Sequence, residues 1–368
     1  MDIQYRFILR SMSFMFTLLL AGLSACSPRT AESGPASPSP LPTGAIPPAA
    51  SIAAPTLSRG ASDGWTSLGP KGGTIFDLVI DPSSPATLYA AIEGGGVWKS
   101  TDAGVNWTPT VKGLTRVEVY ALVIDPATSM LYAGTWPDRG VFKSKGGSEG
   151  WSEANTGLKI TVLSLAIDPK TKGTLYAGTE AGGVFKSLDG GGTWSKVSNG
   201  LKFPATMVYA IAIDPAASAT LYAATMAGLF KSTDASGTWV SANTGLPGSR
   251  VLAVVIDPRA PATLYAGTDV DGVFKSTDGG GTWQAANVGL SDSNIFALAI
   301  DPETPTTLYA GTDGGGVFQT TDGAANWSQI NSGLTSNVIK ILVMDPKTPG
   351  TLYAGTKGGG VWVLHQAK

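Results

Sequence analysis

Cysteine and histidine are almost missing from this sequence, which contains one of each, Cys26 and His365, in 368 residues. With so few of these side chains, no disulfide framework, zinc cluster, Cys–His pair or Ser–His–Asp triad can be assembled. Charge is scarce as well, since 14% of the residues are charged and the formal net charge is −2. This balance argues against a nucleic-acid partner, which would require a basic patch. We therefore expect no metal, no cofactor and no nucleic-acid ligand.

Long apolar runs are absent after the amino terminus, where no stretch reaches the roughly 20 residues that a membrane helix needs. The first 25 residues have the pattern of a secretory signal peptide, with Arg6 and Arg10 before an apolar run from Phe14 to Leu20. The ending Leu-Ser-Ala-Cys resembles the lipobox of bacterial lipoproteins, which implies cleavage before Cys26 and lipidation of its sulfur. Ordinary secretion, with cleavage after a small residue, is the alternative.

Residues 26–60 are dominated by Pro, Ala and Ser and show no apolar periodicity. Such a segment is expected to be a disordered, partly extended tether. The predicted protein is thus exported and anchored by lipid to the cell envelope, either at the outer membrane and periplasm or at the cell surface. We expect its contact with the membrane to be through this anchor alone.

From residue 61 to residue 368 the sequence repeats one unit seven times. Each unit contains an Ile-Asp-Pro step (Met-Asp-Pro in the last copy), a Leu-Tyr-Ala step and a Gly-Val-aromatic step, with Leu for Val in one copy. The repeat tryptophans are 42 to 45 residues apart, at Trp65, Trp107, Trp151, Trp194, Trp239, Trp283 and Trp327. Gly and Pro separate four short β-rich runs in each unit, and no helical period fits. This pattern predicts an all-β fold, a seven-bladed β-propeller of four-stranded antiparallel blades.

The two ends of the repeat region predict how the ring closes. The region begins with an isolated fourth-strand run at residues 64–68 and stops after a third-strand run at residues 360–364. The amino-terminal strand should therefore complete the last blade. Closure of this kind removes exposed sheet edges, and we expect a monomer.

The turn before each repeat tryptophan points to a known family. Residues 276–283 read Ser-Thr-Asp-Gly-Gly-Gly-Thr-Trp, which resembles an Asp-box, also called a BNR repeat. Propellers with this box include sialidases and xyloglucan-active glycoside hydrolases, and photosystem II assembly factors are also seven-bladed exported propellers. The resemblance implies a structural hairpin in which the Asp accepts backbone N–H bonds. The aspartates that it assigns to this structural role are Asp102, Asp189, Asp234, Asp278 and Asp322.

The turns of a four-stranded blade alternate between the two faces of a propeller. The Ile-Asp-Pro turn and the Asp-box turn share one face and are regular, whereas the turns between second and third strands and the links between blades vary. Ligand binding is therefore expected on the varied face. Trp136 is its clearest departure, and could either stack on a sugar or peptide or cover the edge of its own blade. The candidate ligand-binding residues are Arg116, Glu118, Trp136, Asp138, Arg139, Arg250, Asp269 and Asp271.

Sialidases use an arginine triad and a tyrosine nucleophile. Arg116, Arg139 and Arg250 lie on the varied face, but no tyrosine is left for the second role. Seven tyrosines belong to the Leu-Tyr-Ala steps, and Tyr120 and Tyr209 occupy an inner-strand position that holds phenylalanine in other units, so we interpret both as core.

Xyloglucan-active enzymes cleave their substrate between two propellers, whereas this sequence predicts a single propeller. The acidic pairs Glu118 with Asp138 and Asp269 with Asp271 are the carboxylates that a glycosidase could use. We expect a non-catalytic binding or scaffolding propeller for an unidentified protein or polysaccharide. A glycoside hydrolase of the sialidase or xyloglucan-active type is the alternative.

Overall fold

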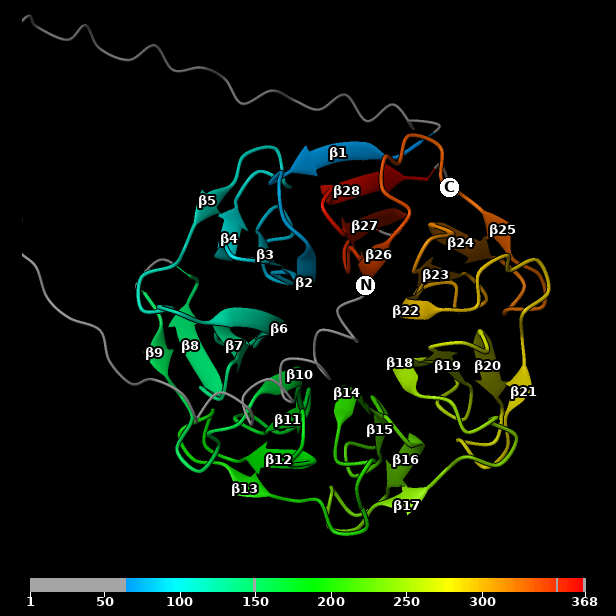
Figure 1. Ribbon diagram of the computed structural model, residues 1–368, viewed down its shortest axis with the longest axis horizontal. Helices are drawn as coiled ribbons and strands as arrows, with labels where there is room; N and C mark the ends of the chain where they lie inside the picture. The colour runs from blue at the N-terminus through cyan, green and yellow to red at the C-terminus, as the bar shows by residue number, and fades with distance from the viewer. Residues whose placement is uncertain (1–63, 148–149, 349, 367–368) are drawn as a thin grey trace, which may run out of the picture. The chain divides into compact units, whose positions relative to one another are not determined.

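The computed structural model describes residues 64–147, 150–348 and 350–366. In these ranges the chain forms strands β1 to β28, which build seven four-stranded antiparallel sheets arranged in a ring (Figure 1). The predicted seven-bladed propeller is thereby confirmed. No helix of the described ranges is long and apolar enough to cross a bilayer. The predicted signal peptide, Cys26 and tether lie outside the described residues.

Each blade runs outward from the centre of the ring in chain order, from a first to a fourth strand (Figure 1). The first strands of blades 1 to 7 are β2 (Ile75–Ile80), β6 (Glu118–Ile124), β10 (Val162–Ile167), β14 (Val208–Ile213), β18 (Val251–Ile256), β22 (Ile295–Ile300) and β26 (Ile339–Met344). The second strands are β3 (Leu88–Ile92), β7 (Met130–Trp136), β11 (Leu175–Thr179), β15 (Leu221–Thr225), β19 (Leu264–Thr268), β23 (Leu308–Thr312) and β27 (Thr351–Thr356). The third strands are β4 (Gly96–Ser100), β8 (Val141–Lys145), β12 (Val184–Ser187), β16 (Gly228–Ser232), β20 (Val273–Ser276), β24 (Val317–Thr320) and β28 (Gly360–His365). The fourth strands are β5 (Thr108–Pro109), β9 (Ser152–Glu153), β13 (Ser195–Lys196), β17 (Val240–Ser241), β21 (Gln284–Ala285), β25 (Ser328–Gln329) and, in blade 7, β1 (Thr66–Gly69).

The ring closes through its amino-terminal strand, as the sequence predicts. Strand β1 pairs antiparallel with β28, placing Thr66 opposite Val363 and Ser67 opposite Trp362. Blade 7 therefore has the strand order β1-β28-β27-β26 and joins the two ends of the repeat region. Closure gives this blade the outer strand that it would otherwise lack.

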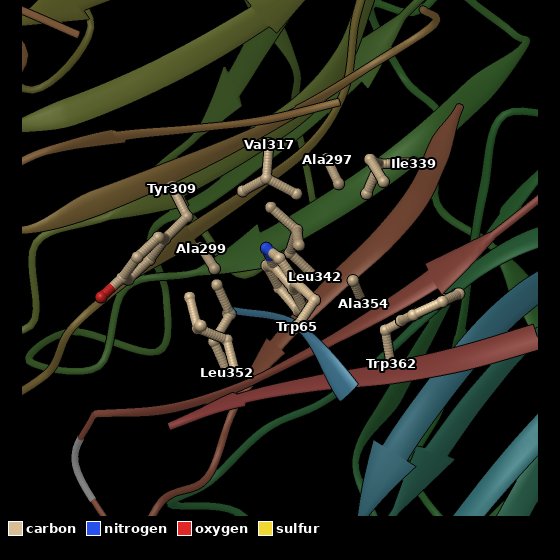
Figure 2. Close-up of a cluster of buried hydrophobic side chains, with 11 residues drawn as sticks. Trp65, Ala297, Ala299, Tyr309, Val317, Ile339, Leu342, Leu352, Ala354 and Trp362 are labelled. Atoms are coloured by element: carbon tan, nitrogen blue, oxygen red, sulfur yellow. The ribbon is translucent and has the colours of Figure 1, made fainter. Parts of the chain in front are cut away.

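The hydrophobic core lies between the blades. Six of the second strands are buried along their whole length, and β7 is buried except at its two end residues, because a Leu-Tyr-Ala strand is covered by a neighbouring blade on each side. One such core joins blades 6 and 7 and includes Trp65, Tyr309 and Leu352 (Figure 2). Blade spacing is tight: at Gly267 an added Cβ would lie 2.6 Å from Ile295 Cγ2 of the next blade. Packing against Ile295 thus favours glycine at this position of blade 5, whereas blades 1 and 4 hold Ala91 and Ala224 there.

In blades 1 to 5 a lysine ammonium donates to a backbone carbonyl in the turn before the fourth strand of the next blade. In four of these blades a tyrosine hydroxyl donates to the same carbonyl. In blade 4 the Tyr222 hydroxyl and the Lys231 ammonium both donate to the carbonyl oxygen of Gly279, at 2.9 Å and 2.7 Å. The ammonium also lies 5.4 Å from the centre of the Tyr222 ring. In blade 7 the corresponding strand partner of Tyr353 is Val363, so this contact has no lysine where the ring closes.

Candidate functional site

The turns that resemble an Asp-box hold their carboxylates in local hydrogen bonds. Asp278 accepts from the Thr282 backbone N–H at 2.9 Å and from the hydroxyls of Thr282 and Ser276, each at 2.7 Å. Backbone N–H donation from the residue four positions later, Thr193 or Thr282, is the main cause that lowers the pKa of Asp189 and Asp278 to about 2. The same local bonding is found at Asp102, Asp234 and Asp322.

The two sets of turns lie on opposite faces of the propeller. The Asp-containing turn of a blade bonds to its Ile-Asp-Pro turn, as in the 2.8 Å contact from Gly279 N to Ala262 O. We call this side the box face. The turns between second and third strands instead bond to the link into the next blade, as in the 2.8 Å contact from Gly272 N to Ser293 O. We call this side, where the sequence varies, the mouth face.

Strand register defines a mouth ring of fourteen residues, two from each blade, at the inner edge of the mouth face. In each pair, one residue comes directly before the buried first-strand residue at which pairing with the second strand begins. The other comes directly after the buried second-strand residue at which this pairing ends. The pairs are Thr74 and Glu93, Glu118 and Trp136, Thr161 and Glu180, Met207 and Met226, Arg250 and Asp269, Asn294 and Asp313, and Val338 and Lys357. In six blades the second residue donates its backbone N–H to the carbonyl of the first at 2.9 to 3.1 Å, and in blade 2 the two are strand partners.

The blade 2 candidates point to different neighbours. Glu118 accepts from the Gly94 backbone N–H of blade 1 at 2.9 Å. Asp138 instead accepts from the Thr161 backbone N–H of blade 3 at 3.1 Å. The proposed acidic pair Glu118 and Asp138 is therefore divided between two blade contacts. Trp136 is half-buried beside Glu118 in the ring.

The two blade 2 arginines lie outside the mouth ring. Arg116 is exposed in the link before β6, two residues before Glu118, with a φ of 59°. Arg139 turns to the outer strand, where its guanidinium pairs with Glu153 at 2.5 Å. It also lies 5.7 Å from the centre of the Phe142 ring. Neither arginine is placed against Trp136 by these contacts.

The blade 5 candidates include Asp269, the most buried carboxylate of the mouth ring. Arg250 Nε donates to Asp269 Oδ2 at 2.5 Å, and the Asp269 side chain is 8% exposed. The other oxygen of Asp269, Oδ1, is buried without a hydrogen-bond partner. Asp271 accepts from the Ser249 hydroxyl and so faces the link of its own blade. The pair Asp269 and Asp271 is thus also divided between different donors.

The interpretation of Tyr120 and Tyr209 as core is wrong. Both are half-buried and occupy a second ring of positions, directly after the buried first-strand residues. Phe76 with Tyr120, and Phe296 with Lys340, are contacts at this position between neighbouring blades. The rings of Phe76 and Tyr120 lie 4.8 Å apart at 66°. The Tyr209 hydroxyl donates to Met207 Sδ at 3.0 Å. Burial raises the pKa of Tyr209, although the adjacent Arg250 guanidinium opposes this rise.

Lys340 and Asp77 are functional candidates that the sequence reasoning missed. Lys340 occupies the second-ring position of blade 7, with its ammonium 3.3 Å from the centre of the Phe296 ring and 3.9 Å from Asp313. Asp77 accepts from the backbone N–H groups of Leu78 and Leu122, at 2.8 Å and 2.7 Å. Burial of its carboxyl among protein atoms outweighs these bonds and raises its pKa to about 7. The signal in the sequence was a charged residue at a repeat position that holds mostly apolar or small residues in the other units.

Glu180 and Asp138 both approach Thr161 and form the acidic pair that the geometry does bring together. Burial raises the pKa of Glu180, the Asp138 charge adds to the rise, and a hydrogen bond with Thr161 opposes it. The described residues bring together no group of three or more His, Cys, Asp or Glu side chains suited to a metal ion. The chemistry that this ring offers is hydrogen bonding, ion pairing and aromatic or thioether contact.

Comparison with known proteins identifies the fold but no family. No protein-family profile matches the chain, and no curated protein matches it. Among solved structures it resembles the GH74 xyloglucanase from Xanthomonas campestris, at 19% identity and a TM-score of 0.67 over 81% of this chain and 53% of that one. It also resembles YCF48 from Cyanidioschyzon merolae, at 14% identity and a TM-score of 0.63 over 82% and 98%.

A third similar structure is the extracellular domain of the one-component system BT4673 from B. thetaiotaomicron, with 18% identity, a TM-score of 0.66, and coverage of 82% and 39%. The chain thus spans about half the length of the GH74 enzyme and less of BT4673. One YCF48 structure holds a D1 peptide. Because hydrolases and peptide-binding propellers share this fold, the fold alone does not distinguish catalysis from binding.

Proposed function

We propose that this chain is a non-catalytic binding propeller that takes a protein or polysaccharide partner on its mouth face. The observation that supports it is the concentration of departures from the repeat in one ring. Five carboxylates, two cationic side chains, two methionines and Trp136 stand at fourteen equivalent positions. Variation at the inner ends of otherwise regular blades is typical of a recognition surface.

Peptide and glycan arrays probed with the full-length protein test this function. We expect a ligand that Glu118→Gln or Trp136→Ala weakens and that substitution on the box face leaves bound. A ligand insensitive to every mouth-ring substitution would contradict the proposal. Gentle membrane solubilisation followed by identification of a stable partner gives an independent test.

A glycoside hydrolase is the second candidate, and Glu180 with Asp138 is the observation that favours it. Burial raises the pKa of the Glu180 carboxyl, as a glycosidase general acid requires, and Asp138 is the second carboxyl of the pair. Turnover of chromogenic glycosides that Glu180→Gln or Asp138→Asn abolishes would establish this function. Turnover unaffected by both substitutions would point to a contaminating enzyme.

We propose further that the propeller belongs to the Asp-box class and is held at the cell envelope by lipid on Cys26. The supporting features are the Leu-Ser-Ala-Cys ending and the Ser-x-Asp-x-Gly-x-Thr-Trp turns. Cys26→Ala should move the protein from the membrane fraction to the soluble fraction of its native cell. Retention of the variant on membranes would contradict a lipid anchor.

A further inference from the structure

The mouth ring is acidic. Its charged members are Glu93, Glu118, Glu180, Asp269 and Asp313 against Arg250 and Lys357. Carboxylates gathered at one end of a ring with low-dielectric walls produce a field that attracts cations. Charge alone does not define a site, so the contacts of each carboxylate decide where a cation would bind.

Asp269 is the carboxylate with unused binding capacity. Its side chain is 8% exposed, and Oδ2 is occupied by Arg250 Nε. Oδ1 is buried with no hydrogen-bond partner, and so is the amide oxygen of Asn294 in the adjacent blade. Buried acceptors are rarely left unpaired because desolvation without a donor is costly. Asp269 is thus prepared for a donor beyond Arg250.

Arg250 is the movable half of this ion pair. Its side chain is 30% exposed, whereas that of Asp269 is 8% exposed. A long side chain with a partly solvated head can leave the site at less cost than the buried carboxylate can. A cationic group from a ligand can therefore replace Arg250 and reach both oxygens of Asp269.

Apolar residues occupy the positions of the mouth face next to the Arg250–Asp269 pair. Met207 and Met226 form the neighbouring pair of the mouth ring, in blade 4, and both are half-buried. On the same face Phe203 is 81% exposed in the link into blade 4, and Val270 is 60% exposed directly after Asp269. Thioether side chains adapt to hydrocarbon of varied shape, which suits the aliphatic stem of an arginine or lysine.

We propose that the mouth between blades 4 and 5 binds a basic side chain of a peptide partner, with its cationic head on Asp269 in competition with Arg250. The stem of that side chain lies along Met207 and Met226. This inference rests on the proposed binding function and specifies its ligand. It gives Arg250 a definite role, an internal cation that occupies the site until the partner arrives.

The test measures affinity of the full-length protein for two labelled pentapeptides by fluorescence anisotropy, one with the sequence Leu-Gly-Arg-Gly-Leu and one with Gln in place of Arg. Asp269→Asn should weaken binding of the Arg peptide by about tenfold or more, the loss expected for a charged hydrogen bond. Arg250→Met should strengthen it by about tenfold, because the competing cation is gone. Asp257→Asn is the matched control, with the same loss of charge in blade 5 but on the box face.

Opposite signs for the two substitutions distinguish this proposal from an anion site, in which Arg250→Met would weaken binding. Thermal denaturation accompanies each measurement, and Arg250→Gln serves as a second variant if Arg250→Met does not fold. Glutamine is uncharged and does not compete as a cation for Asp269, so this variant should also bind the Arg peptide more tightly than wild type. Equal affinity for the Arg and Gln peptides, or unchanged binding in Asp269→Asn, would overturn the inference.

The outcome also separates this inference from the function on which it rests. An array ligand that Trp136→Ala or Glu118→Gln weakens, without preference for basic peptides, would overturn the cation site and support the binding function. If neither the arrays nor the pentapeptides show binding, both proposals fail.

Discussion

The box face and the mouth face are built from the same seven repeats but use their carboxylates in opposite ways. On the box face Asp278 is satisfied by its own turn, and hydrogen bonds led by the Thr282 backbone N–H lower its pKa to about 2. On the mouth face Glu180 has a raised pKa because of burial, and Asp269 retains an unpaired oxygen. Local bonding therefore leaves the box-face acids with a structural task, while Asp269 on the mouth face keeps an oxygen free for a ligand.

The same division holds for the cations. Lys231 on the box side joins blade 4 to the turn of blade 5 through the Gly279 carbonyl. Arg250 on the mouth side pairs within its own blade, with Asp269. Substitutions on the two faces should therefore separate stability from binding.

The largest effect is expected from the box face. The double substitution Tyr222→Phe with Lys231→Met removes both donors to the Gly279 carbonyl. Because Tyr222 is 1% exposed, we expect the free energy of unfolding to fall by about 2 kcal/mol. Denaturant titration measures this loss, and ligand affinity should stay unchanged. A double variant of normal stability with weakened binding would reverse the roles assigned to the two faces.

Trp136→Ala tests the mouth face, where we expect binding to change and stability to stay the same. If the indole contacts ligand, affinity should fall about tenfold, the usual scale for loss of an aromatic contact, with little change in melting temperature. Trp136→Phe is the matched control, because it keeps an aromatic face and should retain most of the binding. A fall in melting temperature with unchanged affinity would show that Trp136 covers the edge of its own blade.

The fold could be predicted from the sequence because each position of the repeat has the same place in the structure of all seven blades. The four β-rich runs of each unit predicted four-stranded blades, and the isolated runs at the two ends predicted closure by β1, both confirmed by strand pairing. The site was harder to predict. Arg116 and Glu118 are both predicted as ligand-binding residues, but strand register makes Glu118 alone the equivalent of Thr74 in the mouth ring.

The remaining errors come from side-chain direction. An aromatic residue such as Tyr209 has the same pattern in sequence whether it faces a neighbouring blade or the centre of the ring. Lys340, in the same strand position, was the available sign that this position is not core. The unpaired oxygen of Asp269 could not be predicted, because it depends on side chains brought together from separate strands.

Asp77 and the box-face acids should make the stability of the fold change with pH in opposite directions. Its pKa is about 7 in the folded protein against an ordinary value of 3.8 for aspartate, mainly because of burial. Between these values the unfolded chain loses its proton first, so stability should fall as the pH rises from about 4 to 7. Asp77→Asn should flatten this decline, measured as melting temperature across that range. Parallel curves for the variant and wild type would contradict the assignment.

The box-face acids contribute in a lower range. Asp189 and Asp278 have pKa values of about 2 in the folded protein, so their contribution is complete above about pH 4 and is lost as the pH falls toward 2. The effect of Asp77 on stability and the effect of the box-face acids can therefore be measured in separate pH ranges. Glu180→Gln, which removes the other carboxyl with a raised pKa, should flatten the upper range less than Asp77→Asn does.

The smallest effect is expected at the rim of the mouth face. Arg139 pairs with Glu153 on the outer strand, and the two side chains are 46% and 51% exposed. Solvent screens such a pair, so Arg139→Ala should change the free energy of unfolding by less than about 0.5 kcal/mol. Its guanidinium points away from the mouth ring, and we expect ligand affinity to remain within about twofold of wild type, since each tenfold change needs about 1.4 kcal/mol. A large loss of affinity in Arg139→Ala would extend the binding surface from the ring to the outer strand of blade 2.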